Sequence, residues 1–383
     1  MKKTILQILK FIGAFAIGGC IGLLGATLIV VLFTETTFSE FISKFTDTNW
    51  GEILGVAAFS ILCGAISIFA HIILHEGGHL VAGLISGYKF LSFRIGSFTL
   101  IRNNNKLQIK KFSIAGTGGQ CLMMPPQRPI DKISTSFYNL GGVLANLIFS
   151  IAVLALLPIF DNAFAWIFIF IFAMFGVLLA LTNGIPMKVG GVSNDGNNVL
   201  YLNKNKKAKE AFVYQLITNA LIQEGKRPNE LPDEYLTFDT DIDYKDPLQV
   251  NHLLLSASTL LDKKQYEACY KMLNTVMQHK SDIVALMVNE TACELIYAAL
   301  VTQRLDEARA LYDEQTQQYV EQHKNVMSAK QRLLCAISYY LDNDTQKAQS
   351  IYDEVYAKRN DYLMQGEVAM DIALMQEILS NKI

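Results

Sequence analysis

Residues 53–84 read ILGVAAFSILCGAISIFAHIILHEGGHLVAGL, and this stretch decides the fold of the first half of the chain. Glu76 is its only charged side chain at neutral pH, so the run is almost wholly apolar. A helix of about 20 apolar residues is long enough to cross the hydrocarbon core of a bilayer. The stretch therefore predicts a membrane-spanning helix over 53–84.

Three further apolar runs have the length of a span, at residues 5–33, 136–160 and 163–187. The first follows Lys2 and Lys3, as the apolar core of a signal peptide does. Its apolar run continues well beyond the length of such a core, which favours an uncleaved first helix. The sequence predicts about four transmembrane helices in a membrane domain of residues 1–200.

Charge divides the chain in the same place. Residues 1–200 carry 13 basic and 8 acidic side chains, whereas residues 201–383 carry 20 and 27. The second half thus has the charge content of a soluble domain. This division excludes a single globular enzyme, and six cysteines without paired spacing exclude a disulfide-rich secreted fold. The net charges of the two halves do not suggest nucleic-acid binding, which would show as a clustered basic face.

Basic residues also predict the orientation of the spans. The segment 88–132 holds eight basic side chains and one acidic one, whereas 34–52 holds four acidic and one basic. Because cytoplasmic loops are enriched in Lys and Arg, we expect 88–132 and both termini in the cytoplasm. The protein is then a multi-pass protein of the cell membrane.

The predicted span over 53–84 contains an HExxH sequence, His75-Glu76-Gly77-Gly78-His79. Residues i and i+4 of a helix share one face, so the imidazoles of His75 and His79 can bind one metal ion. Glu76 then lies beside the metal, where it can act as general base toward a water molecule. Ionisable residues inside a span are costly to insert, so their presence indicates function rather than a polar contact between helices.

Zinc in catalytic sites usually takes three protein ligands. Asp195 is the one acidic residue close to a predicted membrane boundary on the same side as His75 and His79. It is flanked by Asn194 and Gly196, which is also a common turn sequence. We therefore expect a turn that presents Asp195 as the third ligand of one Zn²⁺ ion.

Several ordered segments together resemble a known family. They are HEGGH at 75–79, GGQCLM at 118–123, GGVLAN at 141–146, and Asn183 with Pro186, followed by Asp195-Gly196. Over residues 53–200 the chain resembles the site-2 proteases, a family of intramembrane zinc metalloproteases. The family usually has Pro where this chain has Val143. Pro186 and Asp195 lie nine apart, about four more than in the family, which predicts a longer loop here.

This resemblance implies that His75, His79 and Asp195 bind zinc and that Glu76 is the catalytic general base and acid. It also implies that Asn146 and Asn183 bind the substrate backbone or the developing oxyanion. The alternative for each Asn is a hydrogen bond that packs neighbouring spans together. His71, one helical turn before His75, is expected to support the site rather than to bind the metal.

Residues 88–115 are rich in β-forming residues. Strands at 90–101 and 107–114, separated by Asn103-Asn104-Asn105, predict a hairpin at the cytoplasmic face. An unwound substrate can pair with the edge of such a hairpin. The alternative is a hairpin with a purely structural role at the membrane surface.

A linker at 201–250, with a helical stretch at 206–223, leads to a repetitive region at 251–383. Ala268, Ala308 and Ala348 are spaced 40 residues apart, and an apolar helical stretch precedes each. Each unit reads as a helical hairpin with a small residue at the crossing. The region resembles tetratricopeptide-like repeats, which predicts a short α-helical solenoid that binds a partner protein or serves stability and assembly alone.

The sequence therefore predicts a mainly α polytopic membrane protein with a small cytoplasmic β region and a C-terminal helical repeat domain. The predicted function is a zinc-dependent intramembrane endopeptidase that cleaves transmembrane or signal-sequence segments of membrane proteins. The alternative is a membrane-anchored scaffold with an inactive metal site, which binds partners through its repeats.

Overall fold

The computed structural model describes residues 49–103, 106–111, 118–189, 191–236 and 242–380. The chain divides into two compact units, 1–62 and 63–383. The described part of the first unit is the beginning of helix α3 (Trp50–Ile85), which continues into the second unit. The first predicted span, 5–33, lies outside the described residues.

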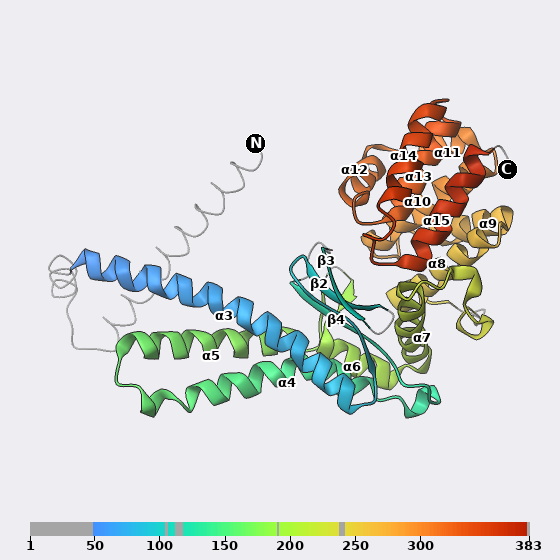
Figure 1. The fold of residues 1–383 in the computed structure, drawn as a ribbon. Coiled ribbons are helices and arrows are strands. Elements are labelled where there is room, and N and C mark those ends of the chain that lie inside the picture. Colours follow the sequence, from blue (N-terminus) through green and yellow to red (C-terminus); the bar gives the residue numbers. More distant parts are fainter. Residues whose placement is uncertain (1–48, 104–105, 112–117, 190, 237–241, 381–383) are drawn as a thin grey trace. The chain divides into compact units, whose positions relative to one another are not determined.

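Within the described residues, three helices are long and apolar enough to cross a membrane: α3, α4 (Thr135–Leu154) and α5 (Ala163–Gly184). They match the predicted spans at 53–84, 136–160 and 163–187. Short 3-10 turns, Ile130–Lys132 and Leu157–Ile159, flank α4. Large apolar side chains on the helices face outward, as lipid contact requires; among them are Phe149 and Phe170. Helices α4 and α5 run side by side in Figure 1.

Small residues allow α3 and α4 to cross with their backbones in contact. A Cβ atom added to Gly78 would lie 2.2 Å from the carbonyl oxygen of Gly141, and one added to Gly141 would lie 2.3 Å from that of Gly78. Small residues at helix crossings are typical of membrane helices. This crossing fixes α4 beside the HExxH turn of α3.

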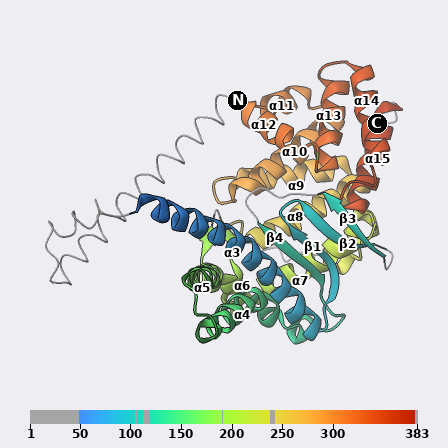
Figure 2. The ribbon, with the colours of Figure 1, turned by 60° about the vertical axis from the view of Figure 1, so that its left-hand side comes forward.

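An antiparallel sheet of four strands follows α3 (Figure 2): β1 (Lys89–Ile95), β2 (Phe98–Asn103), β3 (Lys106–Lys111) and β4 (Gly119–Met124), in the order β3-β2-β1-β4. The predicted hairpin at 88–115 therefore covers three of the four strands, β1 to β3. The expected strand at 90–101 is two strands, because Gly96 turns the chain at φ +57° between Ile95 and Phe98. The turn expected near Asn103 does join β2 to β3. The glycine-rich segment at 118–123 bends at Gly118 and then forms most of strand β4.

Between the spans and the repeats lie the two-stranded hairpin β5 (Lys188–Val189) and β6 (Val192–Ser193), then α6 (Asp195–Lys204) and α7 (Lys206–Gln223). The helical stretch expected at 206–223 is α7. It packs on the sheet: Val213 is fully buried in a cluster with Met123, and Gln223 donates a hydrogen bond to the carbonyl oxygen of Leu91. The predicted linker is thus largely a structured support for the sheet, continued by 3-10 turns Pro228–Glu230 and Asp233–Tyr235.

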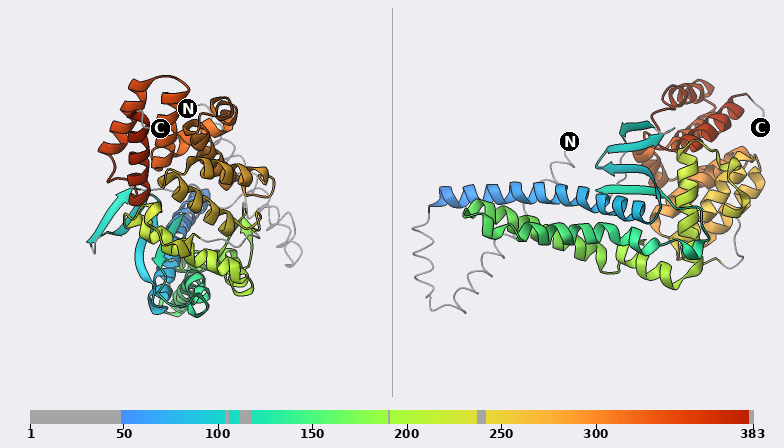
Figure 3. Two further views of the ribbon diagram at one scale, coloured as in Figure 1. Left: turned by 90° about the vertical axis from the view of Figure 1, so that its right-hand side faces the viewer. Right: turned by 60° about the horizontal axis from the view of Figure 1, so that its bottom comes forward.

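Eight helices make up the described C-terminal part (Figure 3): α8 (Pro247–Asp262), α9 (Tyr266–Gln278), α10 (Ala285–Val301), α11 (Leu305–Leu311), α12 (Glu314–His323), α13 (Ser328–Tyr340), α14 (Thr345–Ala357) and α15 (Gln365–Leu379). Ala308 and Ala348 are each the fourth residue of their helices, α11 and α14, and are fully buried. Ala268 is the third residue of α9 and is exposed, and the buried residue at the fourth place there is Cys269. The backbone φ is positive at the residue two positions before each of these helices, which is Lys264, Gln303 or Asn343. The three hairpins therefore share a residue with positive φ in their turns, and their stacking as a solenoid stays a prediction.

Charged side chains lie buried where α10, α13 and α15 meet. Arg332 and Asp371 are almost wholly inaccessible, and an oxygen of Glu294 lies 2.5 Å from the guanidinium of Arg332. Lys330, equally buried, pairs with Glu290 at 2.8 Å. Buried charges persist only when they are paired, so this cluster fixes how the three helices pack.

Candidate metal centre

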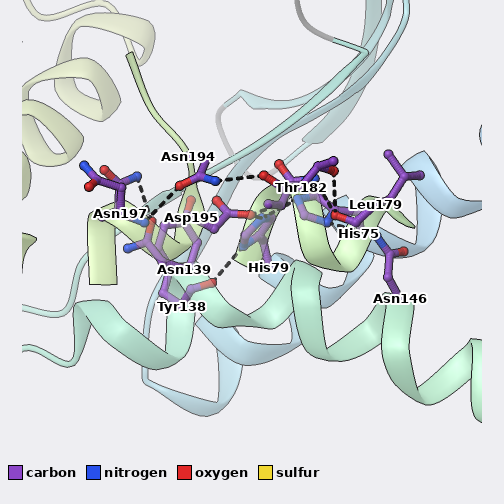
Figure 4. A network of polar contacts seen from close by, with 12 residues as sticks. His75, His79, Tyr138, Asn139, Asn146, Leu179, Thr182, Asn194, Asp195 and Asn197 are labelled. Atoms are coloured by element: carbon purple, nitrogen blue, oxygen red, sulfur yellow. Dashed lines mark hydrogen bonds and ion pairs between the residues drawn. The ribbon is translucent and has the colours of Figure 1, made fainter. Parts of the chain in front are cut away.

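The three predicted metal ligands come together in space. His75 and His79 lie one turn apart on α3, and Asp195 is the first residue of α6. The Nε2 atoms of the two histidines are 3.1 Å apart. The Oδ2 atom of Asp195 lies 3.1 Å from Nε2 of His75 and 3.4 Å from Nε2 of His79. Figure 4 shows the three side chains converging. These three residues can hold one metal ion.

The spacing of these atoms suits a tetrahedral ion. Ligand atoms about 2.05 Å from a tetrahedral centre lie about 3.3 Å from one another, and the three edges here are 3.1, 3.1 and 3.4 Å. The buried Oδ2 atom of Asp195 has no hydrogen-bond donor within the described residues other than these imidazoles. Without a cation, three acceptor atoms would be crowded together at this point.

Asp195 reaches this position because Asn194 clamps the chain around it. The side-chain oxygen of Asn194 caps α6 by accepting from the amide of Asn197, and it also accepts from the amide of Met187. Its side-chain nitrogen donates to the carbonyl oxygens of Thr182 and Ile185. The beginning of α6 is thereby fastened to the end of α5. The sequence pattern suggested only a turn here, although Asn before Asp-Gly is also a helix N-cap signal.

The long spacing between Pro186 and Asp195 is taken up by the β5–β6 hairpin. Beyond it, Gly196 packs so closely on α5 that an added Cβ would lie 2.0 Å from the carbonyl oxygen of Gly184. Any larger residue at 196 would push α6 away from α5. The extra residues therefore leave Asp195 in place as a ligand.

Asp195 is ionised in this site. Burial alone would raise the pKa of its carboxyl group, but the adjacent imidazoles of His75 and His79 lower that pKa to about 2. A carboxylate next to two imidazoles is the form that binds a cation.

The imidazole of His79 is oriented by α4. Its Nδ1 atom lies 2.8 Å from the backbone carbonyl oxygen of Tyr138. A carbonyl oxygen only accepts, so Nδ1 carries the proton and the lone pair is left on Nε2, which faces His75 and Asp195. The hydroxyl of Tyr138 donates to the carbonyl oxygen of Cys121 at 2.6 Å, which ties the same residue to strand β4.

Glu76 lies beside the three ligands without being one of them. It is buried, and β4 runs against its side chain, because a Cβ atom added to Gly119 would lie 2.8 Å from its Oε1 atom. Arg94, buried on β1, donates to the carbonyl oxygens of Gly96 and Gly119 and so fixes this part of β4. Nothing in the sequence pattern singled out Arg94, since only the pairing of β1 with β4 brings it here.

A cavity of about 570 Å³ opens onto the site, and the three ligands, Glu76 and the β4 residues 119–122 line it. Asn183 also lines the cavity, and its amide nitrogen donates to the carbonyl oxygen of Leu179 in its own helix. Asn146 is fully buried, and its amide lies between the imidazoles of His71 and His75. The structure thus brings all six predicted site residues to one cavity, with Asn146 in its inner wall.

Among the residues that the structure describes, His75, His79 and Asp195 are the one group whose ligand atoms are close enough to share a metal ion. The five described cysteines are all buried and unpaired. The C-terminal helices therefore offer no second metal cluster in the part of the chain that is described.

Comparisons with protein-family models, with curated proteins and with solved structures find no significant match for this chain. What the site can do is therefore concluded from its own geometry.

Proposed function

We propose that the protein is a zinc-dependent intramembrane endopeptidase that cleaves transmembrane or signal-sequence segments of other membrane proteins. One observation carries this proposal. The Nε2 atoms of His75 and His79 and the Oδ2 atom of Asp195 form a triangle with edges of 3.1–3.4 Å. The carboxyl group of Glu76 lies beside this triangle, and both histidines and Glu76 belong to a helix apolar enough to cross a membrane.

The ligand set favours zinc. Catalytic zinc sites commonly combine His and carboxylate ligands, three in all, and keep one position open for water or substrate. The 570 Å³ cavity on the open side supplies that access. When bound here, zinc would polarise the scissile carbonyl group and lower the pKa of a water molecule to about 7.

Glu76 supplies the proton transfers of the proposed reaction. Its carboxylate accepts a proton from the attacking water and then delivers that proton to the leaving amine of the cleaved peptide bond. Strand β4 holds the side chain toward the cavity, as the contact with Gly119 shows. Asn183, at the cavity wall, is placed to donate to a carbonyl oxygen of the substrate once its bond to Leu179 is released.

The proposed substrate is an apolar helix that unwinds at the site, because peptide bonds inside a helix have their amides engaged in hydrogen bonds. An extended segment can pair with a free sheet edge. Strand β4 is one edge of the sheet and lines the cavity. Strand β3 is the other edge, and two strands, β2 and β1, separate it from β4. We therefore assign the docking edge to β4 rather than to the hairpin β2–β3.

The test compares purified wild-type protein with Glu76→Gln, using isolated cell membranes as the source of substrates. We expect zinc in both proteins and new membrane-protein fragments with wild type alone, because Glu76 is not a ligand. Glu224→Gln changes an exposed acidic residue and should cleave like wild type. Equal fragment yields from wild type and Glu76→Gln would contradict the proposal.

A second candidate function is a membrane-anchored scaffold with an inactive metal site, favoured by the three similar helix hairpins at 251–383. In either case these helices are proposed to bind a cytoplasmic partner or substrate protein. Zinc binding without any cleavage by wild type, together with a partner that needs these helices for binding, would support the scaffold.

A further inference from the structure

His71, Asn146 and His75 form a chain of buried polar contacts that connects three helices. The Nε2 atom of His71 lies 3.0 Å from the backbone carbonyl oxygen of Phe172 on α5. Its Nδ1 atom lies 3.1 Å from the side-chain oxygen of Asn146, on α4. The side-chain nitrogen of the same amide lies 3.3 Å from Nδ1 of His75. Both His71 and Asn146 are completely inaccessible to solvent.

Metal binding allows a single arrangement of protons along this chain. His75 presents Nε2 to Asp195 and His79, so as a ligand it carries its proton on Nδ1. That N–H requires an acceptor, and a half-turn of the Asn146 amide, which exchanges its equally shaped oxygen and nitrogen ends, supplies the amide oxygen there. The amide nitrogen of Asn146 then donates to Nδ1 of His71, whose Nε2–H donates to Phe172. Every donor meets an acceptor, and both imidazoles are neutral.

Without that half-turn, the orientation of the amide in the structure excludes the metal. Its nitrogen would donate to Nδ1 of His75, which moves the proton of that ring to Nε2, where the metal binds. Its oxygen would require an N–H from Nδ1 of His71, while Phe172 requires one from Nε2. His71 would then be a cation inside an apolar helix, which is unfavourable. The three residues are therefore coupled, because the state of one sets the state of the next.

The surroundings hold this chain in place. A Cβ atom added to Gly142 would lie 2.5 Å from the ring of His75, and one added to Gly176 would lie 2.3 Å from the ring of His71. The hydroxyl of Ser150 donates to the backbone carbonyl oxygen of Asn146. Neither imidazole has room to turn away, so the amide is confined between them.

We infer that Asn146 and His71 are positioning residues that hold His75 in its metal-binding tautomer. This inference rests on the metal centre of the proposed function, but it gives Asn146 a different role from the substrate binding expected from the sequence. Asn146 acts on the metal through His75, and His71 acts through Asn146. Loss of such an outer hydrogen bond typically weakens metal binding 10- to 100-fold.

The test measures zinc affinity of the full-length protein in detergent by competition with a chelating indicator, and the absorption spectrum of its cobalt-loaded form. Asn146→Leu is expected to bind zinc about 10- to 100-fold more weakly than wild type and to alter the cobalt spectrum. Asn146→Asp should restore affinity, because a carboxylate also accepts from Nδ1–H of His75. Its recovery shows that the position tolerates substitution, whatever the yield of Asn146→Leu.

His71→Leu and the double variant His71→Leu/Asn146→Leu test the coupling. We expect His71→Leu to weaken zinc binding and the double variant to bind no more weakly than Asn146→Leu alone. Ser67→Ala removes a buried hydroxyl group one turn earlier on α3, where it has no partner, and should leave affinity unchanged.

Two results would overturn the inference. If Asn146→Leu binds zinc like wild type, Asn146 does not position His75, even if cleavage is lost. If the effects of His71→Leu and Asn146→Leu add, the two residues act separately. Absence of zinc from wild type would instead remove the metal centre itself, whereas the expected affinities without any cleavage would contradict only the proposed protease activity.

Discussion

Asn194 supports the metal centre although it is not a ligand. Its side chain makes three hydrogen bonds to residues 182–187, at and just after the end of α5, and a fourth that caps α6. A net contribution of about 1 kcal/mol for each hydrogen bond is typical. The position of Asp195 therefore depends on this neighbouring amide.

Asn194→Ala should loosen Asp195 and weaken zinc binding by about tenfold or more, because the helix cap and the three hydrogen bonds to residues 182–187 are lost. Asn194→Asp keeps the acceptor that caps α6 but cannot donate to Thr182 and Ile185, so we expect an intermediate loss. Zinc competition on the purified variants measures both. Wild-type affinity in Asn194→Ala would show that α6 is held by other contacts.

At the scale of the helix, three turns share one closing geometry. The amide of Lys226 after α7, of Gln265 after α8 and of Arg304 after α10 each donates to the carbonyl oxygen five residues earlier. The residue before each has positive φ: Gly225 at +106°, Lys264 at +59° and Gln303 at +63°. Glycine is the favoured residue at this position. The turns after α8 and α10 therefore have a strained backbone, because Lys264 and Gln303 carry side chains.

Gln303→Gly should stabilise the protein by about 1 kcal/mol, because glycine adopts positive φ without the steric cost of a Cβ atom. Gly225→Ala is the matched control: a Cβ there has open space around it, so only the backbone cost applies, and we expect a similar loss. Thermal unfolding of both variants measures this. A lower melting temperature for Gln303→Gly would contradict the shared turn.

The ionic cluster of α10, α13 and α15 predicts how stability depends on pH. Burial raises the pKa of Glu367 to about 8, and burial raises that of Asp371 to about 6 despite the nearby Arg332. These carboxyl groups face Glu290, Glu294 and Lys330 as well. A carboxyl whose pKa is higher in the folded state keeps its proton there, so folding is favoured at low pH.

Stability of these helices should therefore fall as the pH rises from about 5 to about 8, because the folded state must lose protons that the unfolded state has already released. Glu367→Gln should flatten this dependence. Labelling of the buried thiol of Cys335, followed by mass spectrometry, reports local unfolding. A labelling rate that falls across this pH range would contradict the assignment.

At the scale of the second unit, two contacts join the membrane-proximal elements to the C-terminal helices. A Cβ atom added to Gly191, in the β5–β6 hairpin at φ +84°, would lie 2.1 Å from a methyl group of Val284, which caps α10. The amine of Lys110 on β3 donates to the carbonyl oxygen of Tyr362. The hairpin that carries the chain to Asp195 thus rests on the C-terminal helices.

Gly191→Ala should therefore disturb the metal centre from a distance and weaken zinc binding severalfold, because both the backbone strain and the clash with Val284 displace the hairpin. Gly96→Ala is the matched control: it lies in a turn of the four-stranded sheet, with positive φ and nothing within contact distance of an added Cβ. It should cost stability only. Equal zinc affinities of the two variants would show that the contact does not support the site.

Local patterns predicted the spans, the HExxH turn and the third ligand, because each is set by periodicity or by residue type within a short stretch. The role of β4 is not evident from its sequence: Gly118-Gly119 is typical of a turn, and only pairing with β1 makes the chain a strand from Gly119 onward. The polar partners of His71 were also beyond prediction, since they come from α4 and α5. Contacts between distant segments depend on how helices cross, which no single stretch of sequence specifies.

The most direct test of the metal centre is the zinc content of the purified protein, measured for wild type, Glu76→Gln and Asp195→Ala. The arrangement of His75, His79 and Asp195 predicts about one zinc ion per chain in wild type and in Glu76→Gln, and much less in Asp195→Ala. Wild type without zinc, or Asp195→Ala with a full zinc ion, would contradict the central claim that these three side chains form a metal centre with Glu76 free beside it.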